Sequence, residues 1–226
     1  MSYRFHSHAR IAAAAAVLLA GLVAEPLSAQ VPGRSPPPPA ARPVPAQTEA
    51  DAYTRYELLA PGSARFRILY EISATAAGAT SYFNPIRKGS VATDEAVFDR
   101  MTGKPLRFEI VSGSKARAGG VRGADSTTNY IQVHLPRAVP RVGEVRILID
   151  KTYEDAKSYV EQDDELIFTR PLGIKRNAVV LPAGYELLSC NYPSQILTLA
   201  DGRIAVSFMN VGSAEVPLTL RARKLP

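Results

Sequence analysis

The sequence predicts an all-β protein, an antiparallel β-sandwich of roughly a dozen strands. Apolar and polar residues alternate over many short segments, and turn residues recur about every eight to twelve positions. In addition, no segment after the N-terminal thirty residues has the apolar spacing of an amphipathic helix of three turns.

Residues 1–29 have the layout of a secretory signal peptide. Arg4 and Arg10 precede thirteen apolar residues, Ile11–Val23, and the segment ends in Leu27-Ser28-Ala29. Thirteen helical residues span about 20 Å, which is too short for a bilayer core of about 30 Å. We therefore expect cleavage before Gln30, a secreted or periplasmic protein, and no transmembrane segment after cleavage. The alternative is an uncleaved helix that tethers the chain to a membrane.

Residues 30–49 are proline-rich, with VPGRSPPPPAARPVPA as the core of the segment. Such a run favours extended polyproline II conformation and cannot bury an apolar core. We expect a disordered spacer, and the alternative is a ligand for a proline-binding groove. Residues 50–226 remain, an ordinary length for a single β-sandwich domain with a full core.

Strand candidates begin at Tyr53. Arg65–Ile72 carries aromatic or aliphatic residues at every second position and mostly charged residues between them, as in a half-buried antiparallel strand. Further candidates with apolar alternation or short apolar runs are Tyr53–Leu59, Glu95–Phe98, Leu106–Val111, Asn129–Leu135, Glu144–Tyr153 and Leu166–Thr169.

The densest run of strand and turn signals is Phe168–Gln195. Its apolar segments, Ala178–Leu181 and Leu187–Cys190, flank the break Pro182-Ala183-Gly184. A basic turn precedes these segments and a polar turn follows them, which is typical of the centre of a β-sandwich with a charged loop on one rim.

The C-terminal region adds a hairpin and a last strand. Asp201-Gly202 lies between the apolar runs Ile196–Leu199 and Arg203–Phe208, and this dipeptide is a strong hairpin signal. Glu215–Arg223 also alternates. Since Pro217 has no N–H to donate to a ladder, we expect this segment to be an edge strand.

Ser112–Thr128 differs from the rest of the domain because it contains four glycines and almost no large apolar residue. We expect a long mobile loop, and loops of this length are functional or disordered. Its basic residues, Lys115, Arg117 and Arg122, would suit the capping of an anionic ligand. A solvated insert is the alternative.

Charge excludes one class of partner. The formal net charge is +6, and it falls to +5 without the signal segment, which carries Arg4, Arg10 and Glu25. A nucleic-acid-binding domain has a stronger and more clustered basic patch, so we expect no nucleic acid partner.

Catalytic and metal-binding sets are missing from the sequence. Cys190 is the single cysteine, so the domain has no internal disulfide, and His134 is the one histidine outside the signal segment. There is no HExxH pattern and no G-x-S-x-G elbow. We therefore predict no catalytic residue, no metal site and no cofactor.

Two basic loops are the best candidate binding site. Asn84-Pro85 leads into Arg87, Lys88, Gly89 and Ser90, which offer two cations beside backbone N–H and hydroxyl donors. The second loop contains the same residue types at Lys175, Arg176 and Asn177. If the two loops meet in space, a partner that carries carboxylate, sulfate or phosphate groups is expected. The alternative is a pair of turns with solvated cations.

The hairpin pattern D-x-x-T-G-x-x-L at Asp99–Leu106, with the strand alternation and the export signal, resembles the N-terminal β-domains of aminopeptidase-N-type metallopeptidases. Those families perform their chemistry with an H-E-x-x-H motif in a following domain, and this motif is absent here. The resemblance implies a fold style over about half of the domain and supplies no catalytic residue.

These observations lead to three functional hypotheses. The first is a secreted or periplasmic, non-catalytic binding module whose partner is a protein or an anionic polymer of the cell envelope. The second is a glycan-active hydrolase or lyase that works with carboxylates and with tyrosines such as Tyr130 or Tyr153. The third is a structural subunit of an envelope assembly.

Overall fold

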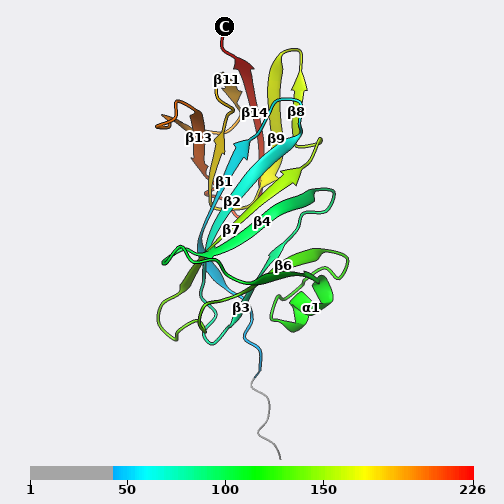
Figure 1. Ribbon diagram of the computed structural model, residues 1–226, viewed down its shortest axis with the longest axis vertical. Helices are drawn as coiled ribbons and strands as arrows, with labels where there is room; N and C mark the ends of the chain where they lie inside the picture. The colour runs from blue at the N-terminus through cyan, green and yellow to red at the C-terminus, as the bar shows by residue number, and fades with distance from the viewer. Residues whose placement is uncertain (1–42) are drawn as a thin grey trace, which may run out of the picture. The chain divides into compact units, whose positions relative to one another are not determined.

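The computed structural model describes residues 43–226 (Figure 1). The described chain forms fourteen strands in three sheets and one short helix, so the predicted all-β, sandwich-like fold is confirmed. The predicted signal peptide and most of the predicted spacer lie outside the described residues. The domain boundary expected at residue 50 falls within the first strand, β1 (Glu49–Leu58).

The largest sheet has seven strands in the order β12-β13-β10-β1-β2-β7-β4. β1 pairs with β10 in parallel, and the other neighbours in this sheet are antiparallel. The bounds of these strands are β2 (Arg65–Ala74), β4 (Val91–Asp99), β7 (Val145–Glu154), β10 (Arg176–Val180), β12 (Gln195–Thr198) and β13 (Ile204–Met209).

Two smaller antiparallel sheets complete the fold. The first has four strands in the order β11-β14-β9-β8, with bounds β8 (Tyr159–Gln162), β9 (Glu165–Leu172), β11 (Tyr185–Cys190) and β14 (Val216–Lys224). The second has three strands in the order β3-β6-β5, with bounds β3 (Ser81–Pro85), β5 (Phe108–Ser112) and β6 (Asn129–His134).

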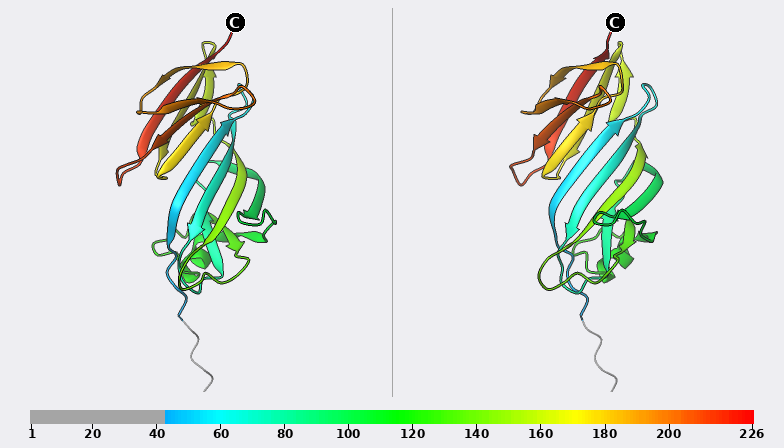
Figure 2. Two further views of the ribbon diagram at one scale, coloured as in Figure 1. Left: turned by 90° about the vertical axis from the view of Figure 1, so that its left-hand side faces the viewer. Right: turned by 60° about the vertical axis from the view of Figure 1, so that its left-hand side comes forward.

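The smaller sheets pack against the seven-stranded sheet at its two ends (Figures 1 and 2). Phe168 of the four-stranded sheet packs on Tyr56 and Phe66, with ring centres 5.7 and 5.4 Å apart. At the other end, Tyr82 of β3 contacts Tyr70 of β2. Buried side chains of all three sheets form one apolar cluster. A junction therefore exists where the two smaller sheets approach each other over β1, β2 and β7.

The prediction of a long loop at Ser112–Thr128 is wrong for the first part of the segment, whereas residues 119–128 form turns without a helix or strand. The segment contains helix α1 (Gly113–Ala118), and the Ser112 side chain accepts the Lys115 N–H at its start. A Cβ on Gly119 would lie 2.3 Å from the Phe83 ring, so this glycine permits close packing. The prediction of a mobile loop relied on the low apolar content of the segment. Here the small residues instead let the backbone pack closely against an aromatic ring.

The expected edge position of the last strand is also wrong, because β14 is paired on both sides by β11 and β9. Pro217 is tolerated there for two reasons. Toward β9 it lies opposite Pro171, and toward β11 it lies beyond the last paired residue, where the Asn191 side chain bonds the backbone of Pro217 and Thr219.

The turn predictions have mixed outcomes. The Asp201-Gly202 hairpin is confirmed, since β12 and β13 pair on either side of it. At Asp99 the turn forms, with the Asp99 carboxylate accepting from Met101 N and Thr102 Oγ1, but its second arm makes only one bridge, Phe98 to Pro105. None of the helices in residues 43–226 is long and apolar enough for a membrane span.

Candidate functional site: a cavity lined by buried cations

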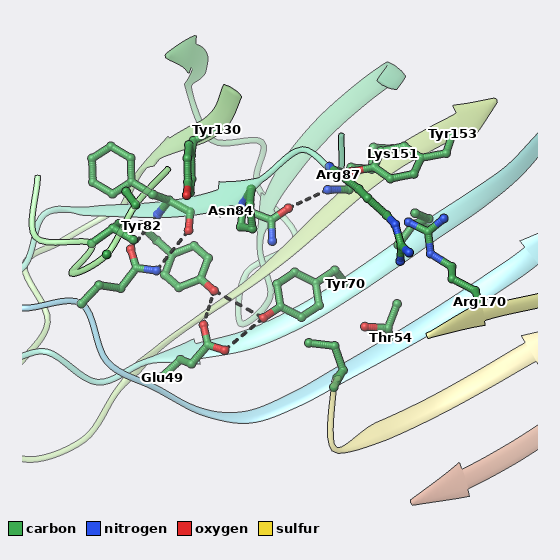
Figure 3. Close-up of a pocket in the computed structure, with 18 of the residues that line it drawn as sticks. Glu49, Thr54, Tyr70, Tyr82, Asn84, Arg87, Tyr130, Lys151, Tyr153 and Arg170 are labelled. Atoms are coloured by element: carbon green, nitrogen blue, oxygen red, sulfur yellow. Dashed lines mark hydrogen bonds between the residues drawn. The ribbon is translucent and has the colours of Figure 1, made fainter. Parts of the chain in front are cut away.

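A cavity of about 430 Å³ lies at the junction of the three sheets (Figure 3), and we call it the junction cavity. Its lining comes from the inner faces of β1, β2 and β7, from β3 and β6, from β9, and from residues 121–124. A cavity of this size suits a small molecule or one residue of a larger ligand. Its lining is unusual because it combines four basic side chains with several phenols.

Lys151 lies in the wall formed by β7. It continues an inward-facing apolar row of that strand, so its side chain is buried and only 4% exposed. Its Nζ donates to Asn84 Oδ1 at 2.6 Å and lies 5.0 Å from the centre of the Tyr153 ring. Burial and the positive charge of Arg170 lower the pKa of Lys151 to about 7. Both forms of the amine are therefore populated at neutral pH.

Arg170 continues the inward row of β9 and is also 4% exposed. Its Nη1 donates to Asp155 Oδ2 at 2.9 Å and to Ser158 Oγ at 3.0 Å. Its guanidinium carbon lies 5.3 Å from the centre of the Phe66 ring and 5.4 Å from that of Tyr153. Burial lowers the pKa of Arg170. Burial alone would raise the pKa of Asp155. However, hydrogen bonds from Ser158 and the charge of Arg170 outweigh this effect, so the Asp155 pKa is lowered.

Arg87 and Arg122 line the same cavity and are exposed to solvent. The Arg87 backbone N–H donates to Tyr153 Oη at 3.1 Å, and its Nη1 donates to the Pro171 carbonyl at 3.4 Å. Arg87 also lies close enough to Arg170 for its charge to lower the Arg170 pKa. The cationic part of the cavity thus extends from buried Lys151 and Arg170 to two guanidinium groups that solvent can reach.

The opposite part of the cavity is polar and contains Glu49. Its carboxylate accepts hydrogen bonds from Tyr82 and, at 3.4 Å, from Tyr70, and the two phenol oxygens lie 3.3 Å apart. Burial raises the pKa of both phenols, and the charge of Glu49 adds to this effect, so both remain protonated donors. Thr54 also lines the cavity, and its buried Oγ1 has no partner among the described residues.

The first predicted loop contributes to this cavity in part. Arg87 lines it directly, whereas Ser90 Oγ donates to Asp155 Oδ2 at 3.2 Å and so supports the partner of Arg170. Lys88 lies outside the lining and pairs with Asp125 at 2.6 Å. Gly89 has a φ of +83°, which its turn requires.

The second predicted loop lies elsewhere. Lys175 Nζ donates to the Gly212 carbonyl, and Arg176 pairs with Asp51 at 2.5 Å. Asn177 is 1% exposed and donates to the Ile174 carbonyl at 2.7 Å. Arg176 and Asn177 line another cavity, with Tyr53 and residues of β13, which shares no lining residue with the junction cavity. Arg87 and the pair Arg176 and Asn177 thus line different cavities, although Ile174, which precedes Lys175, lines the junction cavity.

Tyr130 and Tyr153, the tyrosines named for the hydrolase hypothesis, both line the junction cavity. Six carboxylates of β4, of β7 and of the residue after β7 are absent from its lining: Asp94, Glu95, Asp99, Asp150, Glu154 and Asp155. Within residues 43–226 no group of three or more His, Cys, Asp or Glu side chains is placed to hold a metal ion. His134 contacts Glu109, and Cys190 contacts Tyr192 and Ser194, so the thiol and the imidazole have separate partners.

Sequence reasoning missed Lys151 and Arg170, although a signal was present. Each occupies an inward position of a period-two row whose other members are apolar or aromatic. A charged residue in such a row is buried and requires a partner, which makes it a candidate functional residue.

Comparison with known proteins gives a likeness of fold. No protein-family model and no curated protein matches the sequence. An M1 zinc metallopeptidase from Deinococcus radiodurans is 11% identical with a TM-score of 0.49, over 79% of this chain and 42% of that chain. A two-domain M1 zinc metallopeptidase mutant bound to L-tryptophan is 12% identical with a TM-score of 0.48, over 79% and 43%.

This chain therefore spans less than half the length of the proteins it matches. The matches agree with the resemblance seen in the sequence, and they concern fold style only.

Proposed function

We propose that this chain is a non-catalytic accessory domain of the cell envelope that binds an anionic group in the junction cavity. The observation that carries the proposal is that two buried basic side chains, Lys151 and Arg170, line one cavity, and only Arg170 is paired with a carboxylate, that of Asp155, in the described chain. Two like charges in a poorly solvated interior cost free energy, and a bound anion offsets that cost.

The two exposed guanidinium groups support the same proposal. Arg87 and Arg122 place two positive charges on the solvent-exposed part of the cavity lining. These charges attract anions over about a Debye length. The guanidinium and ammonium donors suit a carboxylate, sulfate or phosphate group, carried by a polymer or a protein of the envelope. Export to the envelope is supported by the N-terminal sequence pattern alone.

Sulfate is a suitable probe because it carries its charge at every pH used. We expect Lys151→Met and Arg87→Gln each to weaken sulfate binding at least tenfold, since a hydrogen bond to a charged group contributes about 1.5–3 kcal/mol. Isothermal titration of the purified protein measures this. Lys104→Met, which changes an exposed turn lysine, is the matched control and should bind as the wild type does.

A double variant, Lys175→Gln with Arg176→Gln, tests the second basic loop in the same titration. We expect less than a twofold change, because Arg176 lines another cavity and Lys175, which donates to the Gly212 carbonyl, is not among the residues that line the junction cavity. Loss of sulfate binding in this double variant, with binding retained in Lys151→Met, would move the site to the second loop and contradict the proposal.

A further inference from the structure

We propose that Lys151 is a carbonyl-reactive amine that captures a 2-oxo carboxylate in the junction cavity as an imine. This inference rests on the proposed function, since the carboxylate of the ligand would occupy the anion site. It adds a covalent step and a ligand class to that site.

The Lys151 side chain lies in the wall of the junction cavity, whose volume is about 430 Å³. Lys151 itself belongs to β7, which is flanked by β2 and β4. Its protein hydrogen-bond acceptor is the neutral amide oxygen of Asn84 at 2.6 Å. In the described chain no carboxylate lies within ion-pair distance of Nζ. One N–H is thus held by Asn84, and the lone pair of the neutral amine is available to a ligand in the cavity.

The guanidinium groups of Arg170 and Arg87 line the same cavity as the Lys151 amine. Arg170 lies close enough to Lys151 for its charge to lower the Lys151 pKa (Figure 3). The charge of Arg87 lowers the pKa of Arg170 in the same way. In a 2-oxo carboxylate the carbonyl carbon is directly bonded to the carboxylate. Guanidinium groups that hold the carboxylate therefore bring the electrophilic carbon to the amine, and this proximity supplies a large part of the rate.

The protonation state of the Lys151 amine also favours attack on a carbonyl. A lysine attacks a carbonyl only as the free amine, and burial in a poorly solvated pocket beside another cation is a known route to that form. Burial and Arg170 lower the pKa of Lys151, whereas Glu95 opposes this effect. The other charged groups that line this cavity are Arg87, Arg122 and Glu49, while Asp155 neutralises part of the Arg170 charge.

The step balances without a further reactant. The Lys151 nitrogen forms a bond to the carbonyl carbon, and one of its two protons moves to the carbonyl oxygen to give a carbinolamine. The hydroxyl group then leaves with the remaining nitrogen proton as one molecule of water, and the C=N bond of the imine forms. The product is a reversible imine, so the domain captures the ligand without turning it over.

The test uses pyruvate with sodium borohydride, which reduces an imine to a stable secondary amine. In the purified protein at neutral pH we expect N-(1-carboxyethyl) modification of Lys151, at least tenfold faster than at the exposed Lys104, as measured by peptide mass spectrometry. Lys151→Arg and Lys151→Met should lose this adduct, and Arg87→Gln should slow its formation at least tenfold. Acetone, which lacks the carboxylate, should be trapped at least tenfold more slowly than pyruvate.

Sulfate titration of the same samples separates the two proposals. If sulfate binds in a Lys151-dependent manner but pyruvate is trapped no faster at Lys151 than at Lys104, the covalent inference is wrong and anion binding stands. If sulfate does not bind and Lys151 is not trapped, both proposals are wrong. Trapping of Lys151 without sulfate binding would contradict the role given to the guanidinium groups.

Discussion

Replacing Asp155 by alanine is expected to lower the free energy of unfolding by about 3–5 kcal/mol, because it leaves the Arg170 guanidinium buried without a counter-charge. Both side chains are at most 9% exposed, and the carboxylate also accepts from Ser158 and Ser90. Removal of this carboxylate therefore strands several donors at once. Urea denaturation followed by circular dichroism measures the loss.

Asp94→Ala is the matched control for this experiment. Asp94 also pairs with an arginine, Arg65, at 3.2 Å, but the two side chains are 67% and 43% exposed. Exposed pairs contribute about 0–1 kcal/mol, so this variant should remain within 1 kcal/mol of the wild type. Equal losses for the Asp155 and Asp94 variants would show that Arg170 is better solvated than the structure indicates.

Lys151→Met is expected to stabilise the protein by about 1–3 kcal/mol at pH 7, since it replaces a buried cation with an apolar side chain of similar length. The same variant should lose anion binding. A gain in stability with a loss of binding would show that Lys151 is maintained for the ligand at a cost to the fold. A loss of stability would instead identify Lys151 as a structural residue.

The pH dependence of stability tests the same group. The Lys151 pKa is about 7 in the folded chain and about 10.4 in the unfolded chain, so between these values the unfolded state binds more protons. Stability should therefore rise with pH, by about 2 kcal/mol from pH 7 to pH 9, and this rise should disappear in Lys151→Met. Urea titrations at pH 7, 8 and 9 are sufficient. A wild-type profile as flat as that of the variant would contradict the lowered pKa.

The strands could be predicted from the sequence because period-two alternation reports which face of a strand is buried, and the Asp201-Gly202 hairpin is a local signal. Features that depend on a neighbouring element could not be predicted. The fit of Gly119 against Phe83 and the position of β14 between two neighbouring strands depend on elements distant in sequence.

The candidate site was only partly accessible to sequence reasoning for the same reason. Arg87 stood out because it lies in a loop with other donors, whereas Lys151 and Arg170 were hidden in strands that looked like core. The alternation in β7 and β9 does place both side chains inward. However, these strands belong to different sheets, and the packing of those sheets brings the two cations to one cavity.

The most direct test of the central claim is a crystal structure of the protein grown with selenate, whose selenium gives an anomalous signal. The account predicts a selenate in the junction cavity, within hydrogen-bond distance of Lys151 Nζ and of the Arg87 or Arg170 guanidinium. In crystals of Lys151→Met at the same concentration this peak should be lost. Selenate bound only at surface cations such as Lys88 or Arg176, with an empty junction cavity in the wild type, would contradict the account.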